Sequence, residues 1–173
     1  MRFTFIIISF LTLFGCAAAG VVHTNDPYTK VSNSYVMMSH GRPIPAERFA
    51  KEALSQFKEQ GDIFGQGEAH VALGSLYKSE MMKLDTKSIE HYKQAVNSFK
   101  TINDYKNTAK SEFALANAYA NIGKNNHQCQ MYSKALSSYN VGINENPDIS
   151  FKINPNFKTF EEMVVAFKNE YCK

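Results

Sequence analysis

Apolar residues recur every three to four positions through most of the chain, and short polar breaks separate these stretches. This spacing is typical of amphipathic helices rather than strands, which alternate with a period of two. The breaks are rich in Gly, Pro, Asn and Asp, the residues that end helices and form turns. The sequence therefore predicts an all-α protein. The predicted helices lie at 27–40, 46–57, 63–82, 88–102, 105–122, 127–141 and from 159 onward.

The predicted helices repeat with a period of about 42 residues. Tyr35, Tyr77 and Tyr119 lie 42 residues apart, and Ala53 and Ala95 keep the same spacing, with Ala135 following 40 residues later. A period between 20 and 50 residues is the sequence signature of stacked supersecondary units. We therefore expect three helical hairpins over residues 26–143.

The segment after the third hairpin has a different character. Residues 144–158 are rich in asparagine and proline and lack helical spacing, which predicts a loop. A last helix is expected over 159–173, because Thr159 and Glu162 form a capping-box pattern at its start. Its apolar residues make a single stripe, as expected of a helix that caps the end of a helical array.

The pattern resembles the tetratricopeptide repeat in its longer form of about 40 residues. The residues that carry this resemblance are Ala53-Leu54-x-x-Phe57 with Leu73-Gly74-x-x-Tyr77, and Ala95-Val96-x-x-Phe99 with Leu115-Ala116-x-x-Tyr119. The third copy departs from the pattern at Gln128, where a small residue is usual, and no fourth copy follows. The resemblance implies a superhelical array whose first helices line a protein-binding groove.

Transferring the groove positions of that family to this chain gives three residues in each hairpin. They are Asn33, Val36 and Met37, then Val71, Ser75 and Lys78, then Phe113, Asn117 and Asn121. Polar side chains at such positions can hydrogen-bond an extended peptide, while the apolar ones offer contact area. The alternative is that these residues pack the inner faces of an array too short to bind a ligand there.

The N-terminus resembles a lipoprotein export signal. Arg2 is followed by an apolar run over 3–14, which is too short to cross a membrane as a helix. Leu13-Phe14-Gly15-Cys16 resembles the lipobox of bacterial lipoproteins, although Phe14 departs from it. We expect a signal peptide over 1–15, lipidation of Cys16 and a tether over 16–25. The alternative is cleavage after Ala19, which would leave a soluble periplasmic or secreted protein.

Two further features bear on location. Ala17 after the lipidated cysteine resembles sorting to the outer membrane, so we expect the protein at its periplasmic face. Removing the signal and the lipidated residue leaves Cys129 and Cys172, and an even number of cysteines in an oxidising compartment favours a disulfide between them. Two buried thiols are the alternative.

Several kinds of chemistry lack support in the sequence. The net charge of +3 is spread along the chain without a basic, aromatic-rich cluster, so no nucleic-acid partner is expected. His70 and His91 have no second ligand at helical spacing, so no metal is expected. Gly65-x-Gly67 lacks the context of a phosphate loop, so no cofactor is expected either. Nor does any serine or cysteine show a recognisable catalytic base, and no catalytic residues are assigned.

The sequence thus predicts a non-enzymatic protein that acts by binding another protein. Two alternatives follow from the resemblance to short repeat lipoproteins. One is an immunity protein that neutralises a secreted antibacterial effector, such as a lipase delivered by a type VI secretion system. The other is an assembly factor for pili or secretion complexes. A self-associating scaffold is a further alternative.

Overall fold

A computed structural model describes residues 24–148, 150–151 and 154–173. Within these residues the chain forms α-helices and no strands, which confirms the predicted all-α class. The helices are α1 (Pro27–Ser39), α2 (Pro43–Gln60), α3 (Ile63–Lys78), α4 (Asp85–Thr101), α5 (Tyr105–Asn121), α6 (Asn125–Glu145) and α7 (Phe160–Tyr171).

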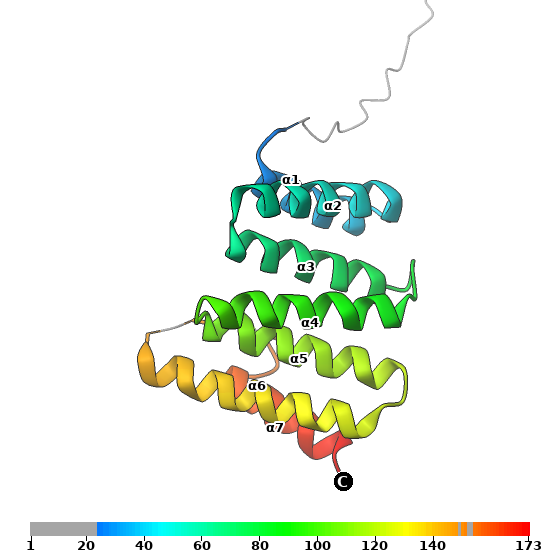
Figure 1. Cartoon of the computed structure of the whole chain (residues 1–173). Helices are drawn as coiled ribbons and strands as arrows, with labels where there is room; N and C mark the ends of the chain where they lie inside the picture. Colours follow the sequence, from blue (N-terminus) through cyan, green and yellow to red (C-terminus); the bar gives the residue numbers. More distant parts are fainter. Residues whose placement is uncertain (1–23, 149, 152–153) are drawn as a thin grey trace, which may run out of the picture.

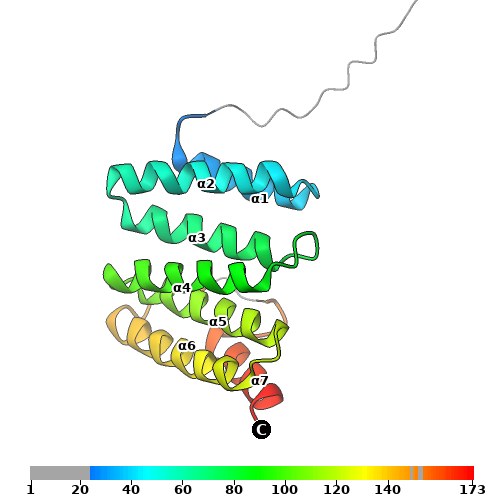
Figure 2. The same ribbon diagram turned by 45° about the vertical axis from the view of Figure 1, so that its right-hand side comes forward.

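The helices are stacked in chain order from α1 at one end to α7 at the other (Figures 1 and 2). Each helix packs mainly against its neighbours in sequence, so α1–α2, α3–α4 and α5–α6 form three successive helical hairpins. Contacts that stay local in sequence are typical of arrays built from repeated hairpins.

The first helix of each hairpin begins in the same way. Asp26, Asp62 and Asp104 precede α1, α3 and α5, and each side chain accepts a hydrogen bond from the backbone N–H three residues later, at 2.7–2.9 Å. These bonds satisfy amide groups that have no partner within the helix. The three helix starts are therefore capped in the same way, with Asp62 and Asp104 at the 42-residue period and Asp26 36 residues before Asp62.

The turns between hairpins also repeat. Gly61 and Asn103, 42 residues apart, both have a left-handed backbone, with φ of 68° and 56°. Glycine and asparagine are the residues that adopt this conformation most readily. The two turns therefore have the same geometry although their residues differ.

Glycines of α3 make room for aromatic rings. A Cβ atom on Gly67 would lie 2.6 Å from the ring of Phe99, and one on Gly74 would lie 2.9 Å from the ring of Tyr92. These glycines admit ring edges from α4, because the large rings fill the space between helices.

The sixth helix is longer than predicted. It begins at Asn125 and continues to Glu145, whereas the pattern ended near Val141 and placed residues 144–145 in a loop. Gly142 is buried, and its Cα packs so closely on Tyr105 that an added Cβ would lie 3.1 Å from the Tyr105 Cβ. This tertiary contact outweighs the weak helix propensity of the local sequence.

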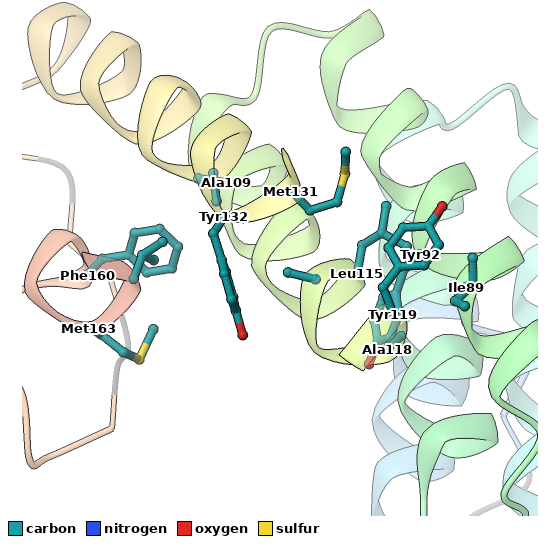
Figure 3. Close-up of a cluster of buried hydrophobic side chains, with 13 residues drawn as sticks. Ile89, Tyr92, Ala109, Leu115, Ala118, Tyr119, Met131, Tyr132, Phe160 and Met163 are labelled. Carbon is teal, nitrogen blue, oxygen red and sulfur yellow. The ribbon is translucent and has the colours of Figure 1, made fainter. Parts of the chain in front are cut away.

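The C-terminal helix covers the open end of the third hairpin. The Thr159 hydroxyl accepts from the Glu162 N–H at 3.0 Å, and the Glu162 carboxylate accepts from the Lys158 N–H at 2.8 Å. Phe160, Met163 and Val164 are buried in the core cluster that also contains Tyr132 of α6 (Figure 3). The capping-box pattern at Thr159 is thereby confirmed.

A cysteine pair joins α7 to α6. The sulfur atoms of Cys129 and Cys172 lie 2.05 Å apart, at disulfide distance, and the two residues are 43 positions apart in sequence. The predicted pairing of these cysteines agrees with the structure. The bridge fixes the end of α7 to the start of α6.

The expected signal peptide over 1–15, the lipidation site at Cys16 and the tether as far as residue 23 lie outside the described residues. Within the described part of the chain, no helix has the length and apolar character needed to span a bilayer.

Candidate protein-binding groove

A hollow of about 240 Å³ lies along the first helices of the three hairpins. We call it the α1–α3–α5 groove. Its lining residues are Tyr35 from α1, Glu68, Val71 and Ser75 from α3, Tyr92 and Phe99 from α4, and Asn107, Lys110, Ser111 and Ala114 from α5.

The lining combines apolar surface with hydrogen-bonding groups. Val71 and Ala114 provide apolar contact area, while the Ser75 and Tyr92 hydroxyls lie 3.0 Å apart and share a hydrogen bond. Burial raises the pKa of Tyr35 and of Tyr92, so both hydroxyls stay protonated over the physiological range. A few placed polar groups over apolar surface are typical of binding sites.

Glu68 supplies the carboxylate of the groove. It is partly buried, and burial raises its pKa; the positive charge of Lys110 opposes that shift and the negative charge of Asp104 adds to it. Among the described residues, Glu68 has no basic partner within 4 Å. A partly desolvated carboxylate without an ion pair is a favourable place for a cationic group from a ligand.

Of the nine residues assigned to the groove from the repeat pattern, two line this hollow and two more lie elsewhere on the first helices. Val71 and Ser75 line the groove directly. Lys78 lies further along α3, where burial lowers its pKa while Asp85 has the opposite effect. Val36 on α1 is 40% exposed, the largest exposure of an apolar side chain in this set.

The other assigned residues take part in the fold. Met37 is 2% exposed and packs with Ala46 and Leu76. Asn33 has a buried side-chain nitrogen without a hydrogen-bond partner. The remaining three are engaged by neighbouring helices: Phe113 packs on Phe160 and Phe167 of α7, Asn117 accepts from the Tyr132 hydroxyl at 2.7 Å, and Asn121 donates to Asp85 at 2.9 Å.

The position of α7 explains why Phe113 differs from its repeat equivalent. Val71 and Phe113 lie 42 residues apart and both face the next first helix, α5 in one case and α7 in the other. The aromatic side chains of α7 cover Phe113, whereas Val71 stays partly open to the groove. The cap helix therefore shortens the groove at its C-terminal end.

Sequence reasoning missed Glu68 and Lys110, although a signal for them was present. They are 42 residues apart and so occupy the same repeat position, one turn before the positions that were chosen. Two charged residues of opposite sign at one repeat position in adjacent first helices could have drawn attention to this face.

The two histidines of the central hairpin come together elsewhere. The Nδ1 atoms of His70 and His91 lie 2.9 Å apart, between α3 and α4. Burial, the neighbouring His91 and Lys58 lower the pKa of His70 to about 4. In the described portion of the chain, no three His, Cys, Asp or Glu side chains converge as metal ligands would.

Fold and groove together define a short all-α array of helical hairpins with an open, partly charged groove along its first helices. No protein-family model matches the chain, and a search of characterised protein sequences gave no match either.

Proposed function

We propose that the protein is a non-enzymatic binding protein of the tetratricopeptide-repeat class that holds a segment of another protein in the α1–α3–α5 groove. The observation that carries this proposal is the groove itself, in which one side chain of each charge and several hydroxyls surround apolar surface. An extended segment needs both kinds of contact, since its backbone must be hydrogen-bonded and its side chains buried.

Glu68 indicates the chemistry of that segment. Its carboxylate is partly buried and lacks a basic partner within the described residues, so a lysine, arginine or terminal amine of the partner would complete an ion pair there. The partly buried ring of Tyr35, which also lines the groove, suits the aliphatic stem or guanidinium of such a side chain. The partner segment therefore carries a basic residue flanked by apolar ones.

The test has two stages. Partners are captured by cross-linking on the tagged protein in the cells that produce it, and the interacting segment is then synthesised and titrated by calorimetry. We expect Glu68→Gln to weaken binding of that segment about tenfold or more, because hydrogen bonds to charged groups contribute roughly 1.5–3 kcal/mol. Glu90→Gln on the outer side of α4 is the matched control, and it should leave the affinity within about twofold.

Equal effects of the two substitutions, or no effect of either, would overturn the proposed site. The identity of the captured protein separates the two biological alternatives. A single stoichiometric hydrolase or toxin domain would indicate an immunity role. Recovery of pilus or secretion components would indicate an assembly factor.

We also propose that the protein is exported and held at the periplasmic face of the outer membrane by lipid on Cys16. The lipobox-like Leu13-Phe14-Gly15-Cys16 supports this location. Metabolic labelling with a fatty acid should mark the wild-type protein and not Cys16→Ser. If both forms are labelled, or neither is, the lipidation proposal is wrong.

A further inference from the structure

A second groove lies on the outer side of the array, between α4 and α6. Its volume is about 380 Å³, and side chains at helical spacing from α4 and α6 form its walls while α5 forms its floor. The lining residues are Lys93, Val96, Asn97 and Lys100 from α4, Glu112, Leu115 and Tyr119 from α5, and His127, Gln130, Met131 and Lys134 from α6.

The walls of this α4–α6 groove are positively charged. Of its lining residues Glu112 is the one carboxylate, and it is 1% exposed. Its two oxygens are already engaged, by Lys100 at 2.7 Å and by the Ser138 hydroxyl at 2.7 Å. Lys93 and Lys134 have no acidic partner within 4 Å in the part of the chain that is described.

The floor of the groove, to which Val96 of α4 and Met131 of α6 also contribute, is apolar apart from the buried Glu112. Val96, Leu115 and Met131 are buried and present hydrocarbon and sulfur surface between the two lysine-bearing walls. The ammonium group of Lys93 lies 5.8 Å from the centre of the Tyr119 ring, where a cation–π contact holds it at the rim. The groove thus combines two unopposed cations with an apolar base.

The equivalent surface one repeat earlier, between α2 and α4, carries acidic residues beside its lysines. Lys51 and Lys58 stand 42 residues before Lys93 and Lys100, so the basic positions are the same. There, however, Lys51 pairs with Glu47 at 2.5 Å.

The floor and the second wall of that earlier groove differ as well. His70 stands 42 residues before Glu112, and His91 stands 40 residues before Met131; their rings contact each other. Glu90 stands 40 residues before Gln130, so an acidic residue occupies the position that is neutral one repeat later. On the earlier surface an ion pair with Glu47 therefore offsets the charge of Lys51, whereas its equivalent Lys93 in the α4–α6 groove has no acidic partner within 4 Å in the described part of the chain.

We propose that the α4–α6 groove is a second binding site, which receives an acidic segment of a partner protein. Carboxylates of that segment pair with Lys93 and Lys134, and an apolar side chain between them packs on Leu115 and Met131. The complementary charge and the apolar floor together favour a segment with acidic residues on both sides of an apolar one. This site uses other residues of α5 than the α1–α3–α5 groove does, and it does not depend on that groove.

The probe is a short fluorescein-labelled peptide of repeated Glu-Glu-Leu, with Gln-Gln-Leu and Lys-Lys-Leu peptides of equal length for comparison. Anisotropy with the full mature protein should show binding of the acidic peptide alone. The double variant Lys93→Gln, Lys134→Gln should weaken that binding about tenfold, because two charge pairs are lost at the edge of a partly desolvated site.

The matched control is the double variant Lys51→Gln, Lys87→Gln, which removes the same amount of positive charge from the surface one repeat earlier. Lys87 lies over the Tyr77 ring as Lys93 lies over the Tyr119 ring, so both double variants also lose one such contact. The control variant should leave the affinity within about twofold. Glu68→Gln should also leave it unchanged, so this test is separate from that of the first groove.

Three outcomes would overturn the proposal. The acidic peptide does not bind in preference to the neutral one, or both double variants weaken binding equally, which would indicate diffuse attraction to a basic surface. In the third, vesicles of phosphatidylcholine containing one quarter phosphatidylglycerol bind and the acidic peptide does not, which would assign the surface to lipid.

Discussion

Single residues set how closely the helices of this array approach. Gly65, Gly67 and Gly74 all lie on α3, and each faces an aromatic ring of a neighbouring helix. The rings of Phe57 and Phe99 are fully buried, so they have no space into which to retreat. Two buried polar residues, His70 and Glu112, lie 42 residues apart and so occupy the same repeat position. His70 contacts His91, and Glu112 pairs with Lys100. These residues give the most direct tests of the packing.

Gly67→Ala should destabilise the protein by about 1–3 kcal/mol, since overpacking of a well-filled core has a cost of that size. The new Cβ would lie 2.6 Å from the Phe99 ring. Urea unfolding followed by circular dichroism measures the change. Replacing glycine by alanine in a helix by itself stabilises the folded state by up to about 1 kcal/mol. A variant more stable than the wild type would therefore show that the Phe99 ring moves aside without cost.

Lys100→Met should be more destabilising than Lys93→Met, although both remove a lysine from the same helix face. Lys100 is the ion-pair partner of the buried Glu112 carboxylate, whereas Lys93 makes a cation–π contact with the Tyr119 ring. Breaking a buried pair from one side costs roughly 3–5 kcal/mol, and the part-exposed lysine reduces this to about 2 kcal/mol here. Equal unfolding free energies for the two variants would contradict this role for Lys100.

Acidification should weaken the contact around His70. The folded-state pKa of His70 is lowered from 6.5 to about 4 by burial, His91 and Lys58. The pKa of the contacting His91 is lowered mainly by burial; Glu90 and Glu47 raise it, while Lys51 and Lys58 lower it. The unfolded chain takes up the proton first, so the contribution is fully present above pH 6.5 and is lost as the pH falls toward 4.

The expected loss at His70 is of the order of 1–2 kcal/mol. It is measured as the difference in unfolding free energy between wild type and His70→Gln at several pH values. The exposed His40→Gln serves as control and should follow the wild-type curve. If the His70→Gln difference stays constant with pH, the histidine contact has no such role.

At the scale of helices, the sequence pattern located the elements well and misjudged where tertiary contacts extend or cover them. The repeat spacing and the helical spacing of apolar residues predicted the hairpins because they are local features. The end of α6 depends on the contact between Gly142 and Tyr105, and the covering of Phe113 depends on α7. Such contacts join residues far apart in sequence and leave no periodic signal. For the same reason only Val71 and Ser75 of the assigned residues line the groove, while Glu68 and Lys110 were missed.

The cysteine pair should determine how firmly α7 is held. Replacing Cys129 and Cys172 together by serine opens a loop of 43 residues, and we expect a loss of about 2–4 kcal/mol in unfolding free energy. Native-state hydrogen exchange should show the loss first in α7. A variant with wild-type stability and an equally protected α7 would show that the aromatic contacts of Phe160 and Phe167 suffice.

At the scale of the whole molecule, the array presents two different surfaces that share α5 but none of its residues. One is mixed in charge and lies along the first helices; the other is basic and lies between α4 and α6. A three-hairpin array is short, and the cap helix shortens its inner groove further. A protein of this shape can hold one segment of a partner in each groove, which increases the overall affinity without a large continuous interface.

The central claim is that the α1–α3–α5 groove holds a partner protein. The most direct measurement replaces Lys110 in that groove by a photo-cross-linking amino acid, with Glu90 replaced in the same way as a control outside both grooves. The proteins are irradiated in the producing cells, and cross-linked peptides are mapped by mass spectrometry. The account predicts that position 110 cross-links to one defined segment of a single protein, containing a basic residue, and that position 90 does not. Cross-links at both positions to the same set of proteins, or none at position 110, would contradict it.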